Sequence, residues 1–148
     1  MVYSCIVVGF DGSNASREAV RRALELAKKF SARLSIVTVV PNPLVMLGEY
    51  MMPIRLNLAP VVEDAKKRLE GLLRELREIS AYDNIGYDVI EGDPAQALVD
   101  YARDNKCDLI VVGRRGLRKV ERFLIGSVSS RVVSLAHGID VLVVETIS

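Results

Sequence analysis

Short apolar runs alternate with longer segments of mixed polarity along this chain. The runs are nearly all apolar, which is typical of strands covered on both faces of a parallel sheet. The pattern predicts five strands, over residues 4–8, 34–40, 85–90, 108–112 and 141–145.

The segments between the runs repeat apolar residues at three- and four-residue spacing, the pattern of an amphipathic helix. Asp93 is the expected N-cap of the third helix, Gln96 completes a capping box with it, and Gly138 is the expected C′ residue of the fourth. Residues 41–60 are irregular up to Pro60. The predicted helices run from Ser13 or Asn14 to Ser31, from Pro60 through Ile79, from Pro94 through Ala102 and from Ser127 to His137.

Strands and helices in alternation predict an α/β fold. We expect one Rossmann-like domain over residues 1–148, an open parallel five-stranded sheet in the order 3-2-1-4-5 with helices on both faces. Right-handed crossovers about a switch point place a ligand crevice at the carboxyl ends of the first and fourth strands. Asp11, Gly113 and Gly126 belong at that end of the sheet.

Composition narrows the class of protein. Half of the 148 residues are hydrophobic and the net charge is +1, as in an ordinary globular domain that does not bind nucleic acid through bulk charge. No apolar run is long enough to span a membrane, and no basic segment precedes the first run, so neither a membrane segment nor a signal peptide is expected. Cys5 and Cys107 form no metal-ligand cluster and are expected as reduced thiols, which favours the cytoplasm.

A glycine-rich segment follows the fourth strand. Gly113 and Gly116 are followed, after nine residues, by Gly126 and Ser127 at the start of a helix. Glycines let a backbone approach a ligand closely, and a helix N-terminus attracts anions. A strand, a glycine loop and a helix N-terminus together predict a phosphate-binding site, and so a nucleotide ligand.

Two other kinds of nucleotide-binding loop are excluded, because the chain lacks their sequence motifs. The chain has neither the G-x-x-x-x-G-K-[ST] sequence of P-loop proteins nor a G-x-G-x-x-G sequence after its first strand. The chain instead resembles the universal stress protein family, in its ATP-binding branch, whose pattern G-x2-G-x9-G-[ST] is matched without a gap. The resemblance extends over the whole chain, through an Asp-Gly-Ser turn, Val-Thr-Val-Val-Pro, Gly-Asp-Pro and Val-Leu-Val-Val-Glu.

The resemblance implies a fold of the adenine nucleotide alpha hydrolase type and a site for ATP, or for ADP or AMP, with Mg²⁺. Asp11 would lie near the ribose or would hold the metal that bridges the phosphates, and Val39 would contact adenine and offer it backbone hydrogen bonds. Phe10 departs from the family pattern and would place a bulky ring near the site. The implied site residues are Gly9, Phe10, Asp11, Ser13, Val39, Val112, Gly113, Arg115, Gly116, Arg118, Gly126, Ser127, Val128 and Ser129.

Simpler interpretations stand beside these roles. Asp11 is also typical of a turn, and Ser127 and Ser129 are typical helix caps, a geometry that phosphate binding shares. Arg115 and Arg118 are the arginines that we expect at the phosphates, although charged runs more often form a solvated face.

The favoured function is an ATP-dependent sensor or switch. No general base is visible beside the predicted phosphates, which argues against rapid catalysis. The resemblance implies a homodimer through the last strand, Val141 to Glu145. The alternatives are a slow Mg²⁺-dependent ATP hydrolase and, least favoured, an RNA-binding protein that uses the Gly-Arg-Arg-Gly loop. His137 is expected to meet the dipole of the last helix rather than to act in catalysis.

Overall fold

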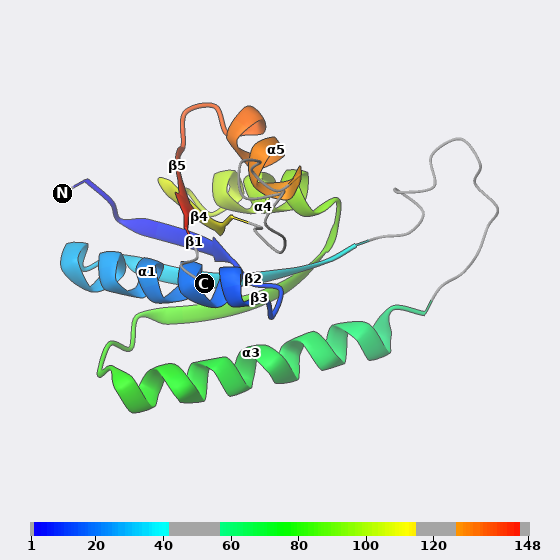
Figure 1. Cartoon of the computed structure of the whole chain (residues 1–148), viewed down its shortest axis with the longest axis horizontal. Helices are drawn as coiled ribbons and strands as arrows, with labels where there is room; N and C mark the ends of the chain where they lie inside the picture. Colours follow the sequence, from blue (N-terminus) through cyan, green and yellow to red (C-terminus); the bar gives the residue numbers. More distant parts are fainter. Residues whose placement is uncertain (1, 42–56, 115–126, 146–148) are drawn as a thin grey trace.

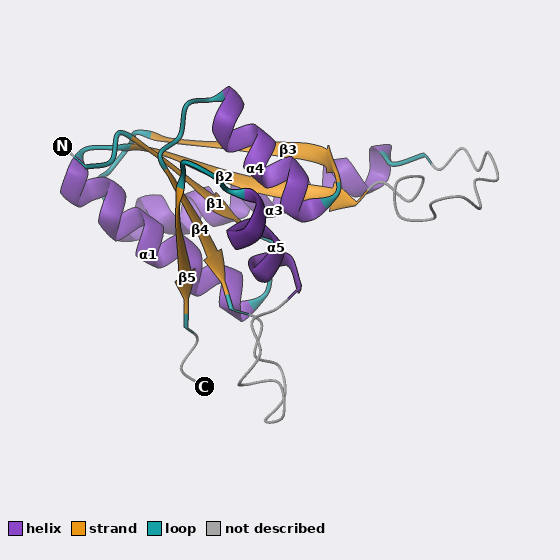
Figure 2. Cartoon of the chain, turned by 90° about the horizontal axis from the view of Figure 1, so that it is seen from above, coloured by secondary structure: helices purple, strands orange, loops and turns teal. Residues whose placement is uncertain are grey.

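A parallel sheet forms the centre of the molecule (Figure 1), in a computed structural model that describes residues 2–41, 57–114 and 127–145. Within these residues the sheet has five strands in the order β3-β2-β1-β4-β5, which confirms the predicted order. β3 and β5 form its two edges, as Figure 2 shows from above. The strands are β1 (Cys5–Gly9), β2 (Arg33–Pro41), β3 (Ile85–Gly92), β4 (Leu109–Gly113) and β5 (Asp140–Val144).

Helices cover both faces of the sheet. Figure 1 shows α3 below the sheet and α4 and α5 above it, and α1 packs with α3 in one core. Alternate residues of one strand enter two separate cores, so that Ile6 packs with α1 and α3 while Val7 packs with α4 and α5. This is why the central strands read as continuous apolar runs. The helices are α1 (Asn14–Phe30), α3 (Ala59–Ile79), α4 (Pro94–Asp104) and α5 (Ser127–Leu135).

The β3 strand differs from the prediction of a strand buried on both faces. Most of its residues are half-buried or exposed, and the side chain of Tyr87 is 39% exposed. β3 pairs only with β2 in the sheet and forms its edge, so fewer neighbours cover it.

Polar caps set the helix ends. Ser13 caps α1 by accepting a hydrogen bond from the Ser16 N–H at 3.1 Å, and Asp93 caps α4 by accepting from the Gln96 N–H at 3.1 Å. The predicted capping box is wrong in its second half, because the Gln96 amide donates to Asp100 at 2.9 Å instead. Gly138 has a φ of +80°, the left-handed conformation that a glycine after a helix adopts easily.

A disulfide joins Cys5 to Cys107, so the expectation of two reduced thiols is wrong. The cysteines are 102 residues apart in sequence, but they lie where the neighbouring strands β1 and β4 begin, with their Cα atoms 4.5 Å apart. The argument for the cytoplasm that rested on reduced thiols therefore does not hold.

Asp108 fastens the same ends of β1 and β4 by hydrogen bonds. Its carboxylate accepts from the N–H groups of Ser4 and Cys5 and from the Ser4 hydroxyl, at 3.0 to 3.2 Å. Burial acts to raise the pKa of this carboxyl, but the hydrogen bonds outweigh it and the pKa lies below its ordinary value.

None of the helices in the described residues is both long enough and apolar enough to cross a membrane.

Candidate functional site

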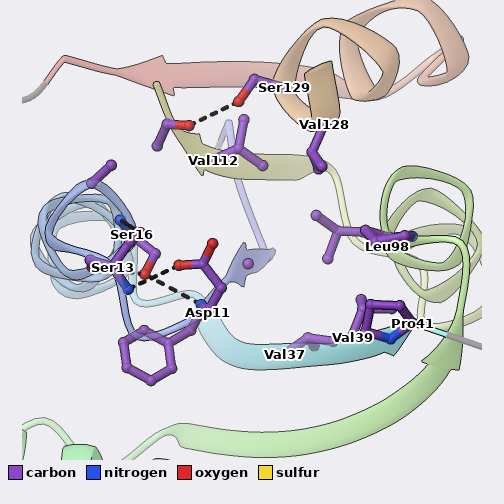
Figure 3. Close-up of a pocket in the computed structure, with 15 residues that line it drawn as sticks. Asp11, Ser13, Ser16, Val37, Val39, Pro41, Leu98, Val112, Val128 and Ser129 are labelled. Atoms are coloured by element: carbon purple, nitrogen blue, oxygen red, sulfur yellow. Dashed lines mark hydrogen bonds between the residues drawn. The ribbon is translucent and has the colours of Figure 1, made fainter. Parts of the chain in front are cut away.

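A cavity of about 250 Å³ opens at the carboxyl ends of β1, β2 and β4 (Figure 3). This is the edge of the sheet at which the sequence predicted a ligand crevice. Its volume lies slightly below the range of about 300–1,000 Å³ typical of ligand pockets. The described residues that line it are Gly9, Phe10, Asp11, Ser13, Ala15, Ser16, Val37, Val39, Pro41, Pro94, Leu98, Val112, Gly113, Val128 and Ser129.

The wall away from α1 is apolar. Figure 3 shows Val37, Val39 and Pro41 of β2 along one side of the space, with Val112 and Val128 across from them. Leu98 of α4 closes the end that faces Asp11. Apolar side chains around a narrow space suit a flat aromatic group better than a strongly hydrated one.

Backbone groups at the end of β2 add polarity to this wall. The Phe10 N–H donates to the Val37 carbonyl at 2.9 Å, so the backbone groups of Val37 face β1. Because the direction alternates along a parallel strand, those of Val39 face the same side. β1 ends at Gly9, opposite Val37. The N–H and C=O of Val39 therefore lie beyond the end of β1, where the cavity begins.

Asp11 lies in the turn between β1 and α1. Its carboxylate accepts from the Ser13 N–H at 2.9 Å, and its own N–H donates to the Ser16 hydroxyl at 3.2 Å. Gly12, between them, has a φ of +85°, which favours glycine. These bonds confirm the role of Asp11 in the turn. Figure 3 shows its carboxylate directed toward the cavity, but its role as a ligand stays a prediction.

Phe10 contributes to the cavity lining, yet its side chain is buried among the core residues that α1 and α3 cover. The Arg17 guanidinium lies 5.8 Å from the centre of its ring. The ring thus packs into the core and holds the start of the turn. The sequence had indicated only that this ring would lie near the site.

Gly113 is required by packing at the end of β4. A Cβ atom at this position would lie 2.4 Å from the carbonyl oxygen of Ala15 in α1, a distance that real Cβ atoms do not show. The carbonyl of Gly113 also accepts a hydrogen bond from the hydroxyl of Ser129 at 2.8 Å. That hydroxyl was expected to contact phosphate, whereas here its proton ties α5 to β4.

The remaining site residues fall on the glycine-rich segment. Arg115, Gly116, Arg118 and Gly126 lie outside the described residues, as does most of the Gly-Arg-Arg-Gly loop for which RNA binding was considered. The described part of α5 begins at Ser127 and places Val128 and Ser129 at the cavity.

Arg114 belongs to this loop and lies within the described residues, and it contacts the β5 side of the sheet. Its guanidinium pairs with Glu145 at 2.5 Å, and its N–H donates to the Val144 carbonyl at 2.9 Å.

Several lining residues were not predicted. Val37 and Pro41 share a face of β2 with Val39, so the two-residue period of a strand could have indicated both. Leu98 lies on the apolar face of α4, which the helical pattern indicates only as core. Pro94 was predicted only as a helix start.

An ion pair at the rim was also missed, because no sequence pattern links its members. The Arg131 guanidinium donates to both carboxylate oxygens of Asp93, at 2.7 and 2.8 Å. Hydrogen bonding from Arg131, together with that from the Gln96 N–H, holds the pKa of the Asp93 carboxyl below its ordinary value.

The carboxyl end of α5 does not use His137 as expected. The helix ends at Leu135, and Arg103 of α4 donates to the carbonyls of Leu135 and His137 at 2.9 and 3.3 Å. A cation thus meets the helix end, but it comes from another helix.

Few acidic or other metal-binding side chains in the described residues could hold Mg²⁺ together. In residues 2–41, 57–114 and 127–145, no three His, Cys, Asp or Glu side chains gather as a metal cluster would require.

Comparisons with known proteins agree on one family. The model of the universal stress protein family matches residues 3–145. Universal stress protein MJ0531 of Methanocaldococcus jannaschii is 35% identical over 147 residues, which cover 97% of this chain and 83% of that protein.

Solved structures agree as well. A crystal structure of a universal stress protein in complex with cAMP is 31% identical, has a TM-score of 0.74 and is covered over 100% of its chain by 99% of this one. A universal stress protein of Archaeoglobus fulgidus in complex with dAMP is 23% identical, with a TM-score of 0.68 over 97% of this chain and 98% of that one, and shares the fold.

Proposed function

Since this chain belongs to the universal stress protein family, we propose that it binds ATP with Mg²⁺ and acts as a nucleotide-dependent sensor or switch. The observation that carries the proposal is the cavity at the carboxyl ends of β1, β2 and β4, where an apolar wall lies beside the backbone of Val39. In support, the family member 31% identical to this chain is described in complex with cAMP, an adenine nucleotide.

The base would occupy the apolar part of the cavity. The N–H and C=O of Val39 offer one donor and one acceptor side by side. Adenine carries the complementary pair on its Watson–Crick edge, the N1 acceptor and the N6 donor. Backbone readout needs no polar side chain, which agrees with the valine, leucine and proline side chains of this wall.

The phosphates would lie at the start of α5. Backbone N–H groups in the first turn of a helix have no partner within the helix, and the helix dipole favours an anion there. Val128 and Ser129 bring this turn to the cavity. We assign the contact to their backbone N–H groups, since the Ser129 hydroxyl donates to Gly113.

The fit of Mg²⁺ rests on Asp11. Mg²⁺ usually keeps several waters and is held by one or two carboxylates together with the phosphates of its ligand. A single carboxylate at the mouth of the cavity is compatible with that arrangement, and Asp11 would supply it. When bound, the ion would neutralise part of the phosphate charge.

Binding is favoured over rapid hydrolysis. Of the described residues that line the cavity, Asp11 alone carries an ionisable side chain. A dedicated hydrolase also needs a group that orients or deprotonates water. ATP turnover at the rate of a dedicated ATPase would overturn the sensor and favour the alternative, a Mg²⁺-dependent hydrolase.

The test is calorimetric titration of ATP, with and without Mg²⁺, into the full chain and two variants. Val39→Pro removes the N–H that faces the cavity while sparing the β3 side of β2, and it should weaken ATP binding about tenfold, as expected for a lost hydrogen bond. Val39→Ala retains the N–H and controls for the loss of side-chain contact. Equal affinities of the two variants would contradict base recognition through Val39.

A homodimer through the β5 edge completes the proposal. β5 pairs only with β4 in the described sheet, and Val141 and Val143 remain partly exposed. An edge with apolar residues can pair with a second copy. Light scattering on the protein as it elutes from a size-exclusion column should give the mass of two chains. The mass of one chain would contradict the dimer.

A further inference from the structure

Two helices that wall the cavity are joined at its rim by one ion pair. Pro94 and Leu98 of α4 line the cavity on one side, and Val128 and Ser129 of α5 line it on another. Arg131 lies one turn after Val128, and its guanidinium donates to both oxygens of Asp93, the residue directly before Pro94. The pair therefore joins the N-cap of α4 to the second turn of α5.

Asp93 is itself held in place. Its carboxylate accepts from the Gln96 N–H at 3.1 Å, and its carbonyl accepts from the Ala97 N–H at 2.8 Å. A carboxylate fixed by the cap of its own helix presents a rigid target to Arg131. The pair thus fixes the first turn of α5 relative to α4 without ordering a second mobile side chain.

A second contact joins the same two helices far from the cavity. Arg103 of α4 donates to the carbonyls of Leu135 and His137, at the opposite end of α5. Neither Arg103 nor Leu135 lines the cavity or is next in sequence to a lining residue, whereas Asp93 directly precedes the lining residue Pro94. The two contacts belong to one helix–helix interface but differ in their distance from the site, so Arg103 provides a matched control for Arg131.

We propose that Asp93 and Arg131 are positioning residues that set the width of the cavity between α4 and α5, and thereby how long an adenine nucleotide stays bound. This inference rests on the proposed function. Exposed ion pairs contribute little to global stability. Arg131 is exposed and Asp93 half-buried, so the effect of the pair is local. Without it, the first turns of α4 and α5 separate more easily and the base loses the contacts that it makes to both walls.

The experiment measures dissociation of a fluorescent ATP analogue by stopped-flow displacement with excess ATP. Arg131→Gln removes the cation, and Asp93→Asn removes the charge while retaining a good N-cap oxygen. Each should raise the dissociation rate about two- to fivefold with little change in the association rate, which is an equal loss of affinity and the effect expected from one partly exposed ion pair. The double variant should match the single variants because both remove the same pair. Arg131→Lys should recover part of the loss.

Arg103→Gln is the control and should leave the dissociation rate unchanged. A rate unchanged in Arg131→Gln, or raised equally in Arg103→Gln, would overturn the positioning role while nucleotide binding stands. An unaltered chain that binds no adenine nucleotide would instead overturn the proposed function, and this inference with it. Circular dichroism and thermal unfolding of each variant exclude loss of the fold as the cause.

Discussion

Gly113 combines two demands in one residue. It follows the apolar run of β4 and opens the loop that the sequence assigns to phosphate, yet its lack of a side chain is explained by the Ala15 carbonyl against which it packs. A loss of nucleotide binding in a Gly113 variant would therefore report on packing as well as on the ligand.

We predict that Gly113→Ala lowers the free energy of unfolding by roughly 1–3 kcal/mol, the usual cost of an extra group in a packed interior. Gly86→Ala is the matched control, because a Cβ atom at that position on β3 meets no atom within 4 Å and should cost nothing. Urea unfolding of both variants measures the difference. Equal stability of the two would show that α1 moves aside without cost.

The roles of single residues could be predicted from the sequence where a residue contacts its near neighbours in the chain. The N-cap roles of Ser13 and Asp93 depend on residues within three positions, and both were predictable. The partner of Asp93 was not, because Arg131 lies 38 residues later in the chain and no local pattern connects them. The role of the Phe10 ring was missed for the same reason, since its neighbours come from the core under α1 and α3.

The junction of β4 and α5 depends on the Ser129 hydroxyl, which is buried and donates to Gly113. We predict that Ser129→Ala lowers the free energy of unfolding by about 1 kcal/mol, because the half-buried carbonyl of Gly113 loses its donor. The ratio of the affinities for ATP and adenosine should stay the same, since that hydroxyl is not directed at the phosphates.

Denaturant unfolding and competition binding with ATP and adenosine measure these two quantities on the same variant. Ser129→Thr, which retains the hydroxyl, is the control for both. A selective loss of ATP affinity, with adenosine binding unchanged, would assign the hydroxyl to the phosphates after all.

The elements themselves were largely predictable. Short apolar runs indicated the five described strands, and apolar residues at three- and four-residue spacing indicated the four described helices, with boundaries that differ by a few residues. The exposure of β3 was missed, although the predicted order 3-2-1-4-5 already placed this strand at an edge of the sheet. The second half of the capping box failed because Gln96 has an alternative partner, Asp100, one turn later.

The molecule as a whole is fastened at one end of the sheet and open at the other. The disulfide and the Asp108 hydrogen bonds join β1 to β4 at their amino ends, and the cavity lies at their carboxyl ends. The parallel sheet was predictable from the alternation of elements, but the disulfide was not, because its two cysteines meet only once β1 and β4 are paired.

We predict that reduction of the disulfide lowers the free energy of unfolding by up to about 4–5 kcal/mol, the loop-closure value for roughly 100 residues in the chain-entropy model. Thermal unfolding with and without a reductant measures it, and Cys107→Ser should remove the dependence on reductant. ATP affinity at 25 °C should be the same in both forms, because the bond lies at the opposite end of the sheet. Free-thiol titration that finds two reduced cysteines without reductant would contradict the bond.

The position of β1 between β2 and β4 has a consequence for synthesis of the chain. β1 pairs with β4, whose first residue is Leu109. A nascent chain that has left the ribosome only as far as α4 can form β1, β2 and β3, but the side of β1 that β4 will cover still carries unpaired backbone groups. Until β4 follows, a strand made almost entirely of apolar residues is also a temporary edge, open to pairing with other chains. Fragments that end before Leu109 are therefore expected to aggregate, whereas those that include β4 close the centre of the sheet.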